Sequence, residues 1–82
     1  MKITISKVAS RDLSRMPANT ARRIASKIRQ YAESPASQEN NVTKLQGRDG
    51  YRLRVGDWRV IFNVDEDGMT VLEIGPRGGI YG

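Results

Sequence analysis

The sequence contains no cysteine and no histidine among its 82 residues. Without cysteine, neither disulfides nor thiolate metal sites can stabilise the fold. Without histidine, the chain lacks a common zinc ligand and the side chain most often used as acid or base near neutral pH. Any catalysis must therefore depend on other side chains, and we expect no metal and no cofactor.

Long apolar runs are missing as well. No segment approaches the length of a transmembrane helix, and the first residues lack the pattern of a signal peptide. We therefore expect a cytoplasmic protein that does not bind a membrane. The length suits one domain over residues 1–82, with a small core and modest stability.

Positive charge is what the sequence has in excess. The net charge is +5, and ten of the fourteen basic residues are arginines. The planar guanidinium of arginine suits bidentate contact with phosphate. Composition alone is equally compatible with a basic, solvated surface, so the positions of the arginines must decide between the two.

Apolar residues in the first half of the chain recur at helical spacing. After a short alternating strand over 2–6, the pattern predicts a helix over 8–16 and a longer helix over 18–33. The longer helix has one apolar stripe, formed by Ala21, Ile24, Ala25, Ile28, Tyr31 and Ala32. Pro35 ends it, and the polar segment 35–41 is expected to be an exposed loop.

The second half changes to a strand pattern from Lys44 onward. Strands are predicted over 51–55, 58–64 and 69–74, joined by a tight turn at Gly56-Asp57 and a longer one over 65–68. The fold class is therefore α+β. An N-terminal strand precedes two helices, which pack on one face of a mostly antiparallel C-terminal sheet.

The Gly56-Asp57 turn also fixes the register of the first hairpin, because a two-residue loop with glycine first fits a type II′ turn. The expected opposite pairs are Val55 with Trp58, Arg54 with Arg59, Leu53 with Val60, and Arg52 with Ile61. Side chains alternate between faces, so one face is apolar and packs on the long helix. Trp58 falls on that apolar face, which favours a core position over a base-stacking platform.

The other face of the hairpin carries Arg52, Arg54 and Arg59. Like charges directly opposite each other in a sheet are destabilising by up to about 1 kcal/mol. Such a cluster favours an anion-binding site, since apolar patterning alone does not require it. Alternatively, these arginines point into solvent or pair with Glu73 and Asp57, which contributes little to stability.

Two more residues near the C-terminus are candidates. Arg77 lies in a glycine-rich stretch over 75–79, which either folds back beside the sheet or is a flexible terminus. Tyr81 is equally compatible with an apolar anchor on the core and with a phenol at the site.

Taken in order and at their spacing, these motifs resemble the RelE/ParE superfamily of bacterial toxins from type II toxin–antitoxin systems. The resemblance is closest to the RelE-type messenger-RNA interferases and covers nearly the whole chain. It is carried by KLQG at 44–47, YRLRVGDWRVIF at 51–62, IGPR at 74–77 and Ile80-Tyr81. It implies a RelE-like domain, similar in architecture to microbial ribonucleases.

The resemblance also implies roles for individual residues. The catalytic set that it implies is Arg54, Arg59, Arg77 and Tyr81. The RNA-binding set that it implies is Lys44, Arg48 and Arg52. No metal ligand is implied.

The activity that the resemblance implies is ribosome-dependent endonucleolytic cleavage of messenger RNA, which inhibits translation. The implied partners are a cognate antitoxin protein, messenger RNA and the 70S ribosome, with DNA contacted only indirectly through the antitoxin complex. Two alternatives stay open. One is a ParE-like inhibitor of DNA gyrase with the same fold, and the other is a nucleic-acid-binding module without catalysis.

Overall fold

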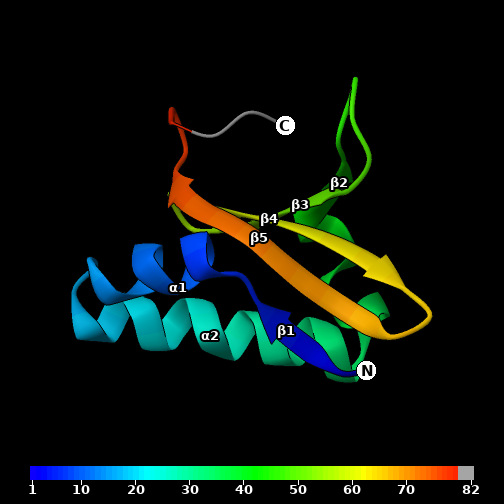
Figure 1. The fold of residues 1–82 in the computed structure, drawn as a ribbon, viewed down its shortest axis with the longest axis horizontal. Coiled ribbons are helices and arrows are strands. Elements are labelled where there is room, and N and C mark those ends of the chain that lie inside the picture. The colour runs from blue at the N-terminus through cyan, green and yellow to red at the C-terminus, as the bar shows by residue number, and fades with distance from the viewer. Residues whose placement is uncertain (80–82) are drawn as a thin grey trace.

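The computed structural model describes residues 1–79 (Figure 1). The elements are β1 (Ile3–Ile5), α1 (Lys7–Ser14), α2 (Ala18–Glu33), a 3-10 helix η1 (Pro35–Asn41), β2 (Val42–Lys44), β3 (Tyr51–Val55), β4 (Trp58–Asp65) and β5 (Gly68–Pro76). The five strands form one sheet in the order β1-β5-β4-β3-β2. β1 pairs parallel with β5, and the other neighbours are antiparallel. The α+β prediction is confirmed.

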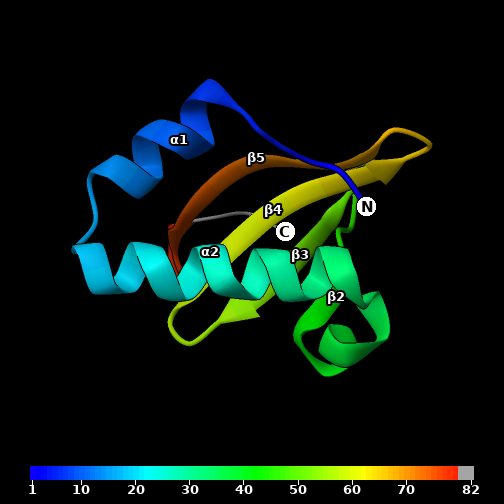
Figure 2. The same ribbon diagram turned by 90° about the horizontal axis from the view of Figure 1, so that it is seen from below.

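Both α-helices lie on the same face of the sheet (Figures 1 and 2). Ser6 caps the first turn of α1, because its hydroxyl oxygen accepts a hydrogen bond from the Ala9 amide at 3.0 Å. α2 buries Ile24, Ile28 and Ala32 from its predicted stripe. Within the described residues, no helix is both long and apolar enough to cross a membrane.

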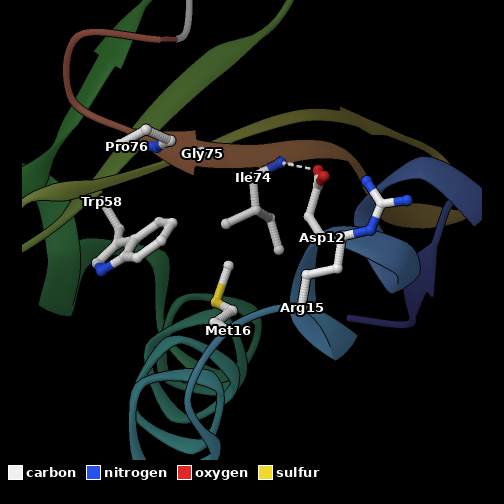
Figure 3. Close-up of a pocket in the computed structure, with 7 residues that line it drawn as sticks. All are labelled: Asp12, Arg15, Met16, Trp58, Ile74, Gly75 and Pro76. Carbon is white, nitrogen blue, oxygen red and sulfur yellow. Dashed lines mark hydrogen bonds between the residues drawn. The ribbon is translucent and has the colours of Figure 1, made fainter.

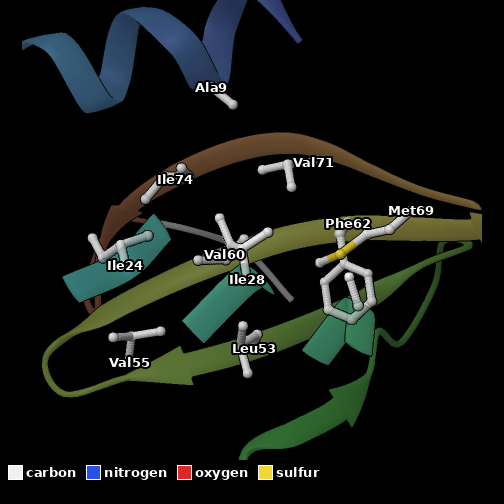
Figure 4. Close-up of a cluster of buried hydrophobic side chains, with 11 residues drawn as sticks. Ala9, Ile24, Ile28, Leu53, Val55, Val60, Phe62, Met69, Val71 and Ile74 are labelled. Carbon is white, nitrogen blue, oxygen red and sulfur yellow. The ribbon is translucent and has the colours of Figure 1, made fainter. Parts of the chain in front are cut away.

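The core lies between the helices and the sheet (Figure 4). Phe62 is fully buried, with its ring centroid 4.8 Å from that of Tyr31 and 5.6 Å from that of Tyr51. The buried cluster consists of Ala9, Ile24, Ile28, Ala32, Leu53, Val55, Val60, Phe62, Met69, Val71 and Ile74. Trp58 packs against this cluster, as its place in the predicted register requires.

The β3–β4 hairpin has the predicted register at every pair. Gly56, the first residue of the turn, has φ +60°. Within residues 1–79 only glycines have positive φ, so the second turn residue, Asp57, has negative φ. Positive φ at the first turn residue alone agrees with a type II′ turn. A Cβ at Gly56 would meet only the guanidinium of Arg23, which is the end of a flexible side chain, so the positive φ is what favours glycine there.

A β-bulge interrupts the pairing of β4 with β5. Ile61 pairs with Glu73, but Phe62 pairs with Val71, so Leu72 is an extra residue on β5. The Ser6 hydroxyl donates to the Leu72 carbonyl at 2.7 Å, which satisfies a backbone acceptor at the bulge.

The loop expected over 35–41 is wrong, although most of its residues are exposed as expected. These residues form η1, and Gln38 within it is only 5% exposed. The Gln38 amide nitrogen donates to Gln30 Oε1 of α2 at 3.1 Å. A polar segment can therefore pack against a helix, because its amide side chains satisfy one another.

Candidate nucleic-acid interface

Three arginines of the hairpin lie on the sheet face away from the helices. Arg54 on β3 pairs directly with Arg59 on β4, and Arg52 lies two residues before Arg54 on the same strand. Arg52, Arg54 and Arg59 line a concavity of about 170 Å³, together with Asn40, Asn41 and Thr43. The predicted arginine face is therefore present in the structure, and its three arginines line a concavity.

Neutral oxygens hold two of these guanidinium groups. Arg59 Nη1 donates to the carbonyl oxygens of Gly56 and Trp58, each at 2.9 Å. Arg54 Nη2 donates to Asn41 Oδ1 at 3.1 Å. These contacts orient both groups through neutral oxygens, which do not neutralise their charge.

Arg59 is at the centre of the positive charge. Burial of its guanidinium lowers the pKa of Arg59, and the nearby Arg52, Arg77 and Arg54 lower it further, while Asp57 raises it. Because an arginine stays protonated in proteins, the lowered pKa means that burial and the neighbouring cations disfavour the charge of Arg59, and not that its charge state changes. The cluster therefore concentrates positive potential where an anion can enter.

Arg77 joins the cluster because the chain turns after β5. Its amide donates to the Asp57 carbonyl at 2.8 Å, and the Gly79 amide donates to the Pro76 carbonyl at 2.9 Å. The residues after β5 rise above the sheet on the side away from the helices (Figure 1). These hydrogen bonds hold Arg77 beside the β3–β4 turn and near Arg59, whereas Tyr81 lies outside the described residues.

Of the two other predicted RNA-binding residues, Lys44 lies on the opposite face of the sheet and Arg48 lies in a loop. Lys44 pairs with Tyr51, so it shares the helix-side face of the sheet, and it lines a separate concavity with Asp49 and Asp65. Arg48 is exposed in the loop between β2 and β3, which rises above the sheet on the side away from the helices (Figure 1). The structure thus brings together Arg52, Arg54, Arg59 and Arg77, and it places Lys44 apart from them.

Sequence reasoning missed the uncharged wall of the concavity, formed by Asn40, Asn41 and Thr43. Thr43 is opposite Arg52 in the pairing of β2 with β3. The alternation Val42-Thr43-Lys44-Leu45 indicates the position of Thr43, because a strand that begins at Val42 places Thr43 on the arginine side of the sheet.

A second concavity, of about 180 Å³, lies on the helix side of the sheet (Figure 3). Asp12 of α1 forms one wall and Trp58 another, with Met16 and Ile74 between them. Asp12 Oδ2 accepts a hydrogen bond from the Ile74 amide at 2.9 Å, which ties α1 to β5. Among residues 1–79, no three carboxylate, cysteine or histidine side chains gather as a metal-binding group.

The fold and the arginine face define a class of small α+β domains with a cationic sheet face. The family model that describes the ParE toxin of type II toxin–antitoxin systems (parDE) matches residues 3–81. The chain therefore belongs to the RelE/ParE superfamily of toxins from type II toxin–antitoxin systems. No curated protein sequence matches it.

Solved structures of toxin–antitoxin proteins have the same fold. A chain of the archaeal RelE–RelB complex from Pyrococcus horikoshii OT3 is 30% identical, with a TM-score of 0.77 and coverage of 96% of this chain and 97% of that one. The intact E. coli RelBE complex gives 20% identity, a TM-score of 0.72 and coverage of 90% and 93%. The isolated E. coli RelE toxin gives 20% identity, a TM-score of 0.71 and coverage of 90% and 81%.

Proposed function

We propose that this toxin is an endoribonuclease that cleaves messenger RNA on the ribosome. The observation that carries the proposal is that three arginines share one sheet face, with Arg54 directly opposite Arg59 and Arg77 close to Arg59. A fold gains no stability from that juxtaposition until an anion arrives. A phosphodiester is an anion of the right kind, because guanidinium groups bind phosphate oxygens with directed, charge-assisted hydrogen bonds.

The reaction is attack of a 2′-hydroxyl on the adjacent phosphate, with departure of the 5′-oxygen. Arginine stays protonated and cannot be the general base, so Arg54, Arg59 and Arg77 act by holding the phosphate and stabilising the developing negative charge. Loss of one such group lowers the rate about 100-fold or more. We assign two roles to Tyr81: its phenol orients the 2′-hydroxyl, and it exchanges a proton with that hydroxyl.

Glu73 is a second candidate for the proton acceptor. It pairs with Ile61, which is opposite Arg52, and so it shares the arginine side of the sheet. An ion-pair role is the alternative for this carboxylate. Glu73→Gln separates the two roles, because loss of a general base flattens the acidic limb of the pH–rate profile, whereas loss of an ion pair leaves its shape unchanged.

A cognate antitoxin is the proposed protein partner. The solved relatives from Pyrococcus horikoshii and E. coli are toxin–antitoxin complexes. An antitoxin segment with acidic and apolar residues would neutralise the repulsive arginine face and cover exposed apolar surface, stabilising a small domain. In this proposal, DNA is contacted only through the toxin–antitoxin complex.

The name of the matching family model favours a second candidate, inhibition of DNA gyrase in the manner of a ParE toxin. Brief expression in a heterologous bacterium, followed by mapping of RNA 5′ ends, separates the two. New 5′ ends within translated messages that disappear in Arg59→Ala support the nuclease. Loss of plasmid supercoiling with intact messages supports the gyrase inhibitor, and RNA binding with neither effect indicates a non-catalytic module.

A further inference from the structure

Gln38 is the single buried polar side chain among residues 1–79, at 5% exposure. Its amide nitrogen donates to Gln30 Oε1 of α2 at 3.1 Å, and its carbonyl oxygen accepts from Asn41 Nδ2 at 3.4 Å. Both hydrogen-bonding ends of Gln38 are thus occupied, and it joins the helix layer to the last residue of η1.

The chain of hydrogen bonds continues from Asn41 to the arginine face. Asn41 Oδ1 accepts from Arg54 Nη2 at 3.1 Å, and Asn41 lines the same concavity as Arg54 and Arg59. A relay of three amide side chains, Gln30, Gln38 and Asn41, therefore connects α2 with Arg54 on β3 (the amide relay).

The direction of the amide relay is fixed at both ends. Arginine and lysine can only donate hydrogen bonds. At one end Arg54 requires the oxygen of Asn41, and at the other Lys27 Nζ donates to Gln30 Oε1 at 3.4 Å. With its oxygen facing Arg54, Asn41 presents its nitrogen to Gln38, and Gln38 in turn presents its nitrogen to Gln30. Each amide thus has one orientation that satisfies its neighbours.

We propose that Asn41 is a positioning residue for Arg54, and that Gln38 holds the Asn41 amide in place. The proposal rests on the nuclease function proposed above. Repulsion from Arg59 across the strand pair favours a guanidinium that swings away from the phosphate site. A neutral amide oxygen keeps Arg54 at the concavity without neutralising it, which a carboxylate would do.

Single-turnover cleavage of ribosome-bound message provides the first test. Asn41→Ala should lower the cleavage rate about 10-fold, with little change in the toxin concentration that gives half-maximal rate, because orientation is lost and charge is kept. Gln38→Met should have a smaller effect in the same direction. Glu39→Gln, on the same 3-10 helix and exposed, is the matched control and should cut at the wild-type rate.

A double-mutant cycle separates positioning from a structural role. If Asn41 acts through Arg54, then Asn41→Ala causes no further loss of rate in an Arg54→Ala background. An equal fold-loss in both backgrounds, or a wild-type rate for Asn41→Ala, overturns the proposal. Thermal melts of the same variants show whether a loss of rate comes from unfolding.

NMR of the arginine side chains in the free toxin tests the contact between Arg54 and Asn41 without depending on catalysis. The hydrogen bond to Asn41 should slow rotation of the Arg54 guanidinium relative to the exposed Arg22, and Asn41→Ala should abolish the difference. If wild-type protein cuts no message but shows slowed rotation, the nuclease function fails and the positioning contact stands. Equally fast rotation of Arg54 and Arg22 in wild type refutes the contact.

Discussion

Replacement of Arg54 by glutamine should show how strongly the arginine cluster destabilises the free toxin. Arg54 is opposite Arg59 and two residues after Arg52 on the same strand, and a like-charge pair across strands costs up to about 1 kcal/mol. Arg54→Gln removes this repulsion, but it also removes the hydrogen bond to Asn41, which contributes a similar amount of about 0.5–1.5 kcal/mol. The change in stability at a single ionic strength is therefore a poor measure of the repulsion.

Salt dependence separates the two contributions. The screening length falls from about 30 Å at 0.01 M salt to about 3 Å at 1 M, which removes the repulsion and leaves the hydrogen bond largely unchanged. Between these conditions, wild type should gain about 1 kcal/mol of unfolding free energy relative to Arg54→Gln. For a domain of this size that corresponds to about 4–8 °C in melting temperature.

Urea denaturation followed by circular dichroism at both salt concentrations measures this difference. Arg22→Gln is the matched control, because it makes the same change in net charge at an exposed position of α2. If Arg54→Gln and Arg22→Gln respond to salt equally, the arginine face is not under electrostatic strain. The physical reason for expecting an anion there would then be lost.

Three further outcomes are expected. Asp12→Ala should lower the unfolding free energy by about 1–3 kcal/mol, because it leaves the Ile74 amide without its acceptor. Asp12→Asn retains an acceptor and should cost less. Equal losses of unfolding free energy for the two variants in urea denaturation would contradict this. Burial, aided by Tyr51, raises the pKa of the Tyr31 phenol, so its contribution to stability is present below pH ~10 and is lost as pH rises through the raised value. Tyr31→Phe should therefore flatten the alkaline fall in stability, and an unchanged profile would assign that fall to other groups. Tyr81→Phe should keep the melting temperature and ribosome affinity but lower the cleavage rate, and a wild-type rate would exclude the phenol from the reaction.

The hairpin that carries the site could be predicted from sequence because local chemistry determines it. A glycine in the first position of a two-residue turn sets the pairing of β3 with β4, and strict alternation then assigns each side chain to a face. For the same reason the juxtaposition of Arg54 with Arg59 followed from the sequence. The position of Arg77 did not, because it depends on a turn after β5 that glycine permits but does not require.

The amide relay could not be predicted, because nothing in the local pattern marks Gln38 as buried. A run of polar residues after Pro35 has the composition of a loop, and only the contact with Gln30 of α2 makes its burial favourable. The parallel pairing of β1 with β5 also escaped prediction, since it joins segments more than sixty residues apart and no turn sets its register. Tertiary contacts, and not local preferences, decide both features.

The bulge at Leu72 constrains how this chain can change in length. Val71 and Ile74 both face the core, although they are three positions apart and strict alternation would put them on opposite faces. Deletion of Leu72 would leave Val71 and Ile74 two positions apart, so regular alternation would keep both on the core face without a bulge. An insertion elsewhere in β5 would instead turn one half of the strand over relative to the other. Either the core would lose Met69 and Val71 to solvent, or the end of the strand that leads to Arg77 would turn toward the helices. Libraries of random single-residue insertions and deletions should therefore show that changes are tolerated in the loops, that deletion is tolerated at Leu72, and that insertions are selected against elsewhere in β5.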